Sequence, residues 1–111
     1  MAKFQITKDK KGEFRWQFLA DNGLELANGG EGYKQIDGCN NGIRVVKEWA
    51  GKEEVYQDAK KEWRWRFKAK NNQIVAVSSE SYKAEGDCKH GLGLVKAGAA
   101  AAQVEDKSGG K

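Results

Sequence analysis

The sequence predicts an α+β protein made of two tandem β-β-β-α repeats, and three observations support this fold class. The chain matches itself when it is shifted by 49 residues. In each copy, short segments with alternating apolar residues precede a segment with helical spacing. The apolar pattern of the first strand then occurs a third time near the C-terminus.

The repeat extends without a gap from Asp9 and Asp58 to Val46 and Val95. Its matched positions include an aromatic and basic stretch, a tyrosine, a cysteine and a glycine. These pairs are Arg15 and Arg64, Trp16 and Trp65, Phe18 and Phe67, Tyr33 and Tyr82, Cys39 and Cys88, and Gly42 and Gly91. A fixed period of this length is typical of duplicated supersecondary units, so we expect two similar halves.

Three strands open each repeat. The first is expected around residues 3–9 in one copy and 54–58 in the other, and the second at 14–20 and 63–69, where apolar residues alternate strictly. "DNG" at 21–23 and "KNN" at 70–72 supply residues that tolerate positive φ, as a tight hairpin requires. The third strand follows at about 24–28 and 73–78.

A helix follows the strands in each repeat. The stripe Cys39, Ile43, Val46 and Ala50, and its counterpart Cys88, Leu92, Val95 and Ala99, fall at i, i+4, i+7 and i+11. Asp37 and Asp87 lie near the two helix starts, and we expect them to cap the helices. Gly42 and Gly91 lie inside the helices, which favours a close approach of helix to sheet.

The third copy of the first-strand signal comes after the second helix. Ile6, Val55 and Val104 are spaced by 49 residues, so we expect a closing strand at about residues 103–106. The middle copy would both end the first repeat and begin the second. The two halves should therefore share one sheet, with the closing strand paired to the other half.

Composition limits the classes of function. Of the residues, 39% are hydrophobic and 32% charged, which indicates a soluble globular chain, and no apolar run approaches the length of a membrane span. The N-terminal residues lack the pattern of a secretory signal, so a cytoplasmic location with reduced thiols is expected. The net charge of +4 comes from 20 basic residues mixed with 16 acidic ones, which weakens an electrostatic case for nucleic acid.

A family resemblance adds to this prediction. The motifs "GEFRWQFLADNG", "EGYK" and "CNNGIRVVK" in the first copy match "KEWRWRFKAKNN", "ESYK" and "CKHGLGLVK" in the second. Together they resemble the YegP-like family of small bacterial proteins of unknown function, over nearly the whole chain. The resemblance implies one antiparallel sheet, two helices on one face, and terminal strands exchanged between the halves. It implies no catalytic residues, and Asn72 departs from it where the family tends to have a turn glycine.

The stretch "EWRWRF" at residues 62–67 raises the question of nucleic-acid binding. On a strand its aromatic side chains point one way and its basic side chains the other. We expect the helices to cover the aromatic face, which leaves no exposed rings for base stacking. A role in binding phosphates is the alternative for the basic face. Its candidate residues are Arg15, Arg64, Arg66, Lys68 and Lys70.

The cysteines suggest a second alternative, a thiol-based redox protein. Cys39 and Cys88 lie in the first helical turn, where the helix dipole lowers a thiol pKa. They also head the apolar stripes, which favours buried small side chains. Neither belongs to a CxxC motif, so no zinc site is expected. The single histidine, His90, should point away from Cys88 and lie on the surface, so no catalytic pair is expected.

The sequence therefore predicts a non-enzymatic binding module with no catalytic residues, cofactor or metal and with an unknown partner. It should be a monomer with internal pseudo-two-fold symmetry, and it should not bind a membrane. The first repeat is placed at residues 1–51 and the second at 52–111, with a flexible tail over the last few residues. Trp49, which faces Gly98 in the alignment, is expected at the edge of the core.

Overall fold

The computed structural model describes residues 2–108, and its elements follow the order predicted from the sequence. Three strands precede each helix, and one strand follows the second helix. The elements are β1 (Lys3–Lys8), β2 (Phe14–Leu19), β3 (Glu25–Asn28), α1 (Ile36–Glu48), β4 (Gly51–Gln57), β5 (Trp63–Ala69), β6 (Ile74–Ser78), α2 (Glu85–Ala99) and β7 (Gln103–Asp106). The predicted tail at residues 109–111 lies outside the described residues.

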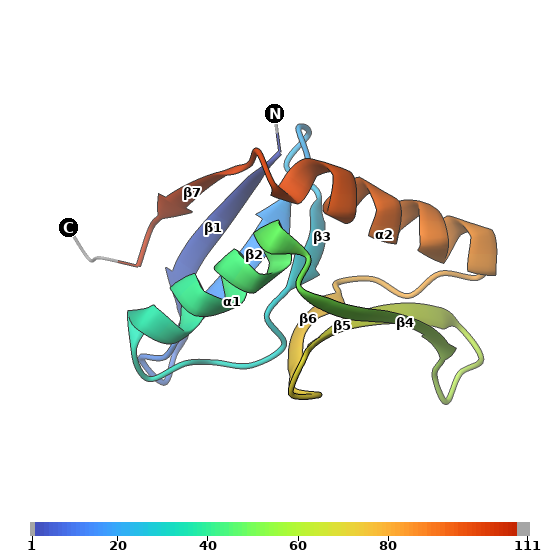
Figure 1. Cartoon of the computed structure of the whole chain (residues 1–111), viewed down its shortest axis with the longest axis horizontal. Helices are drawn as coiled ribbons and strands as arrows, with labels where there is room; N and C mark the ends of the chain where they lie inside the picture. The colour runs from blue at the N-terminus through green and yellow to red at the C-terminus, as the bar shows by residue number, and fades with distance from the viewer. Residues whose placement is uncertain (1, 109–111) are drawn as a thin grey trace.

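All the described strands belong to one sheet, in the order β4-β5-β6-β3-β2-β1-β7. The halves join at its centre, where β3 and β6 pair antiparallel. At one end β7 lies beside β1, and β4 lies at the opposite edge (Figure 1). The predicted α+β fold with a shared sheet is thus confirmed, with one departure from a purely antiparallel sheet. Strands β1 and β7 run parallel, which makes the sheet mixed.

One face of the sheet carries the aromatic core. Trp16, Phe18, Trp65 and Phe67 are fully buried, as predicted. Both helices pack on this face, and each contacts the two halves, since α1 lies against β2 and β6, and α2 against β5 and β3. The basic side chains that alternate with the aromatic ones occupy the opposite face. This opposite face is called the open face below.

The end of each helix packs on an aromatic residue of the other repeat. The ring of Trp49, at the C-terminus of α1, lies 4.3 Å from that of Phe67. At the matching place in α2, a Cβ on Gly98 would lie 3.3 Å from Cζ of Phe18. Trp49 is half-buried against the core, as predicted for an edge residue. Through these reciprocal contacts the two repeats share one hydrophobic core.

The helix starts differ from the prediction. The N-cap residues are Gln35 and Ala84, whose backbones are extended and whose side chains form no cap hydrogen bond. Asp37 and Asp87 lie inside the first turns, so the prediction that they cap the helices was wrong. Their charges still complement the positive end of the helix dipole.

Candidate binding surface

Two of the predicted phosphate-binding arginines, Arg15 on β2 and Arg64 on β5, are paired with aspartates of the preceding turns. Arg15 Nε donates to Asp9 Oδ2 at 2.8 Å, and Arg64 Nε donates to Asp58 Oδ2 at 2.9 Å. The other carboxylate oxygen of Asp9 accepts two backbone N–H groups of the turn after β1. Asp58 does the same in the second repeat. Each arginine therefore braces the turn that joins the first two strands of its own repeat.

The electrostatics agree with a structural role for these pairs. The hydrogen bond from the guanidinium of Arg15, with the turn N–H groups, lowers the pKa of the Asp9 carboxyl. The same contacts with Arg64 lower the pKa of Asp58. Sequence reasoning missed these braces, although the signal was present. An aspartate stands six residues before the arginine in both repeats.

Two more of the predicted basic residues, Arg66 and Lys68, lie on β5, next to the edge strand β4. Arg66 Nε donates to Glu54 Oε1 at 2.6 Å, and Lys68 Nζ lies 3.4 Å from the other oxygen. The Arg66 guanidinium also lies over the Tyr56 ring, 4.6 Å from its centroid. The hydrogen bond from Arg66 is the main reason that the pKa of Glu54 is lowered. One carboxylate is thus shared by two cations.

Two further lysines lie beside this group. Lys52 and Lys70 are exposed and line a cavity of about 280 Å³ together with Gly51, Ala69 and Asn72. Neither lysine forms an ion pair with any of residues 2–108. In the register of the sheet Lys52 stands directly opposite Lys68, so two like charges are neighbours. We call Lys52, Glu54, Arg66, Lys68 and Lys70 the basic edge, and its four cations and one carboxylate leave three positive charges in excess.

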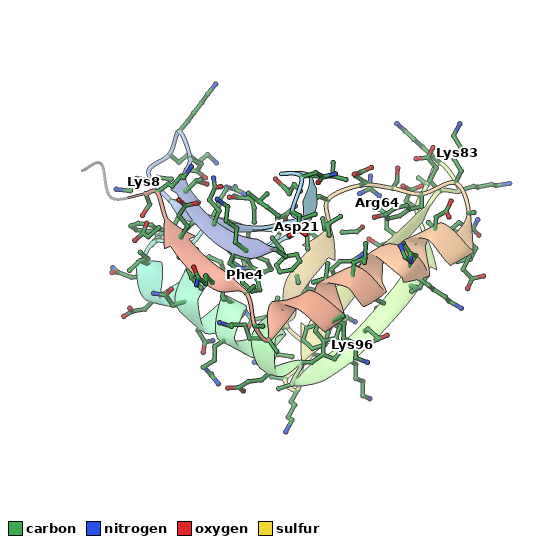
Figure 2. All side chains as sticks on the ribbon, turned by 90° about the horizontal axis from the view of Figure 1, so that it is seen from above. Phe4, Lys8, Asp21, Arg64, Lys83 and Lys96 are labelled. Atoms are coloured by element: carbon green, nitrogen blue, oxygen red, sulfur yellow. The ribbon has the colours of Figure 1, made fainter. Side chains whose placement is uncertain are left out.

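The first repeat has no such excess. The counterparts of Glu54, Arg66, Lys68 and Lys70 are Gln5, Gln17, Leu19 and Asp21. Its one matching lysine, Lys3, is paired with Glu105 of β7 at 2.6 Å. Charged side chains project all around the molecule, with Lys8 and Lys83 near opposite ends (Figure 2). The basic edge is therefore a local imbalance in a mixed surface.

A polar cluster lies on the open face at the centre of the sheet. Ser79 Oγ donates to Glu25 Oε2 at 2.6 Å, and Asn28 Nδ2 donates to both side chains. Glu25 and Asn28 line a cavity of about 220 Å³. The matching positions in the second repeat are the apolar Ile74 and Val77. These polar groups satisfy one another and do not add to the basic edge.

The structure places both thiols in the core. Cys39 and Cys88 are fully buried. Burial, with a smaller effect of the Asp106 charge, raises the pKa of Cys39 to about 11. Burial also raises the pKa of Cys88. This supports the predicted packing role of the cysteines, and the redox alternative gains no support.

The other candidate groups are dispersed. His90 is exposed, as predicted. Within residues 2–108, no three His, Cys, Asp or Glu side chains are grouped closely enough to hold a metal ion. Gly42 makes the expected close approach to the sheet, since a Cβ there would lie 3.2 Å from Trp16 Nε1. None of the α-helices described is both long and apolar enough to cross a membrane.

The fold and this surface define a small two-repeat α+β protein whose sheet has one open face and one basic edge. The family described as "Domain of unknown function (DUF1508)" matches residues 9–57 and again residues 58–106. The chain therefore belongs to this family, which confirms the YegP-like resemblance. The family has no established function.

Two curated relatives are similar to the chain over about half of its length. A UPF0339 protein from the ptx operon 5′ region of Stutzerimonas stutzeri is 43% identical over 53 residues, which are 48% of this chain and 47% of the relative. A UPF0339 protein of Agrobacterium fabrum is 46% identical over 48 residues, 43% of this chain and 76% of that relative. The latter is thus little longer than one repeat.

Two solved structures share the fold over almost the whole chain. The protein of unknown function yegP from E. coli superposes with a TM-score of 0.88 at 25% identity, covering 99% of this chain and 96% of that one. A UPF0339 protein from Shewanella oneidensis gives a TM-score of 0.85 at 20% identity, covering 96% and 92%. Both matches include the two repeats and the shared sheet.

Proposed function

We propose that this protein is a non-enzymatic binding module and that the basic edge binds a partner with negative charge. The observation that carries the proposal is the contrast between the repeats. The basic edge of the second repeat has three positive charges in excess, whereas the matching positions of the first repeat hold Gln5, Gln17, Leu19, Asp21 and one lysine, Lys3, which is paired with Glu105.

The local energetics favour an anionic partner. Like charges that face each other across two strands destabilise a sheet, and Lys52 faces Lys68. The single carboxylate at this place, Glu54, is already shared between Arg66 and Lys68. A bound anion would offset the remaining repulsion and would not displace the Glu54 contacts. Electrostatic attraction of this kind raises association rates and selects the partner by charge.

Nucleic acid is the second candidate, because the same excess charge would attract phosphates. Of the five residues predicted for that role, Arg15 and Arg64 each pair with an aspartate of their own, Arg66 and Lys68 share the one carboxylate of Glu54, and Lys70 forms no ion pair within residues 2–108. The core rings of Trp65 and Phe67 are buried, so they offer no stacking surface for bases. An acidic protein segment needs only the charges and fits this surface better.

The proposal also includes a monomeric state and a cytoplasmic location. A monomer is supported by the pairing of β3 with β6, which joins the halves within one chain. The cytoplasmic location and the boundary between residues 51 and 52 stay predictions from the sequence. The non-enzymatic role likewise stays a prediction from the sequence.

A titration with a labelled short polyglutamate peptide tests the proposal. We expect salt-sensitive binding to the parent, because exposed charges are screened as ionic strength rises. Arg66→Gln/Lys68→Gln/Lys70→Gln should weaken binding about tenfold. The control Lys10→Gln/Lys11→Gln/Lys34→Gln removes the same charge elsewhere and should leave binding nearly unchanged. Equal weakening of both variants would show an effect of net charge alone and would refute a localised site.

A further inference from the structure

The first strands of the two repeats, β1 and β4, differ in how many neighbouring strands they have. Strand β4 is the counterpart of β1, since the shift of 49 residues that relates the repeats aligns residues 3–8 with residues 52–57. Strand β1 pairs with β2 on one side and with β7 on the other. Strand β4 pairs with β5, and within residues 2–108 no strand lies on its other side. Figure 1 shows β7 beside β1 at one end of the sheet. Strand β4 lies at the other end, with β5 as its neighbour.

The register shows which backbone groups of β4 face outward. Asp58 N–H donates to the Glu62 carbonyl at 2.8 Å, so Asp58 and Glu62 form a hydrogen-bonded pair next to the pairing of Gln57 with Trp63. Because hydrogen-bonded and non-bonded pairs alternate in an antiparallel ladder, Glu53, Val55 and Gln57 direct their N–H and C=O groups away from β5. The first repeat confirms this phase, since the carbonyl of Ile6, the counterpart of Val55, accepts from Lys107 N–H at 2.8 Å.

The side chains show what kind of strand fits there. On the covered edge, Glu105 of β7 pairs with Lys3 across the open face at 2.6 Å. The counterpart of Lys3 is Lys52, which is exposed and has no ion-pair partner within the described residues. Lys68 and Lys70 stand beside it. Lys52 thus places at the edge of β4 the same kind of cation that Lys3 provides for β7. Lys68 and Lys70 add further positive charge there.

We propose that the outer edge of β4 binds an extended acidic peptide segment of a partner protein as a parallel strand, in the way that β7 lies on β1. The inference rests on the proposed function, because it assigns the anionic partner of the basic edge to one class. Backbone hydrogen bonds to Glu53, Val55 and Gln57 supply the attachment, as in other cases of strand addition. An acidic side chain opposite Lys52 supplies the selectivity.

The chain itself provides a probe. A synthetic peptide with the sequence AQVEDKS, which corresponds to residues 102–108, carries the pattern of β7. Titrated into the isotope-labelled full-length protein, it should shift the backbone amide resonances of Glu53, Val55 and Gln57. The amides of Phe4 and Ile6 should stay unchanged, because β7 already covers β1. A scrambled peptide of the same composition should bind more weakly.

Two variants test the two parts of the site. Val55→Pro removes one outward N–H and leaves the inward ladder to β5 in place, so peptide binding should be lost. Its control, Val55→Ala, trims the side chain, keeps the N–H and should bind. Lys52→Glu should weaken binding about fivefold through charge reversal. Its control, Lys60→Glu, changes an exposed lysine of the following turn and should have little effect.

The outcomes separate this inference from the proposed function. If the peptide binds with salt sensitivity but shifts only side-chain resonances of the basic edge, the surface binds anions and strand addition is refuted. If shifts appear at Phe4 and Ile6, the peptide has displaced β7 and β4 is not the site. If neither this peptide nor polyglutamate binds, both proposals fail. If a single-stranded oligonucleotide competes with the peptide at far lower concentration, the partner is nucleic acid and the peptide class is wrong.

Discussion

The two repeats share their covered face and differ on their open face. Trp16 and Phe18 are matched by Trp65 and Phe67, and all are fully buried. Across the same strands, Gln17 and Leu19 of the first repeat correspond to Arg66 and Lys68 of the second. Both repeats keep the same backbone fold, because the side chains on the covered face must pack against the helices. The open face imposes no such requirement, so it is where the repeats can acquire different properties.

The largest expected effect tests the shared face. Trp16→Ala and Trp65→Ala each remove a fully buried ring, and each should lower the free energy of unfolding by about 3–5 kcal/mol. Chemical denaturation of both variants measures the loss. Similar losses in the two repeats would support an equivalent core, whereas a Trp65→Ala variant as stable as the parent would contradict the assignment of faces.

Removal of the closing strand tests the difference between the edges. A chain truncated after Ala100 lacks β7 and its ladder with β1, and it also loses the buried Ala102. With each backbone hydrogen bond worth about 1 kcal/mol net, the melting temperature should fall sharply. An unchanged melting temperature would show that β7 contributes nothing and that the covered and open edges are equivalent in energy.

Glycine substitutions in two turns of the second repeat are expected to raise the stability of the fold. Lys61 and Asn72 have φ of 64° and 70°, where the first repeat has Gly12 and Gly23. A lysine in the left-handed region is strained, so Lys61→Gly should stabilise the fold by about 0.5–1 kcal/mol, and Asn72→Gly by less. The reverse change, Gly12→Lys, should destabilise it. A loss of stability in Lys61→Gly, measured by thermal unfolding, would contradict this account of the turns.

The smallest expected effect concerns the turn braces. Asp9 and Asp58 have pKa values below the ordinary 3.8, so each favours folding when ionised. Their contribution is fully present above pH 3.8 and is lost as the pH falls through the lower folded-state pKa. Asp9→Asn and Asp58→Asn should therefore melt below the parent near neutral pH, and the difference should shrink in acid. A gap between parent and variant that stays constant down to pH 2 would exclude this origin.

Most of the fold could be predicted because it follows from apolar periodicity and duplication. The alternation in residues 63–69 placed Trp65 and Phe67 on one face, and the third copy of the strand signal at Val104 located β7. The parallel direction of β7 could not be predicted, since a pattern with period two is the same in either direction. The N-caps at Gln35 and Ala84 were also missed, because their backbones cap without a recognisable side chain.

The candidate site could be predicted only as a list of basic residues. Arg66 and Lys68 were named from the sequence, but so were Arg15 and Arg64, which are held by aspartates. Which cations are neutralised depends on pairing across strands, and the register decides it. The role of Lys52 was missed, because its free position follows only from the absence of a strand beside β4 within the described chain.

The most direct test of the central claim exchanges the open faces of the repeats. Arg66→Gln/Lys68→Leu/Lys70→Asp gives the second repeat the residues of the first, and Gln17→Arg/Leu19→Lys/Asp21→Lys does the reverse. The affinity of each variant for polyglutamate is measured at low salt. We expect the first exchange to abolish binding and the second to retain it in full at the original basic edge. Undiminished binding by the first variant would contradict the claim that the second repeat carries the binding surface.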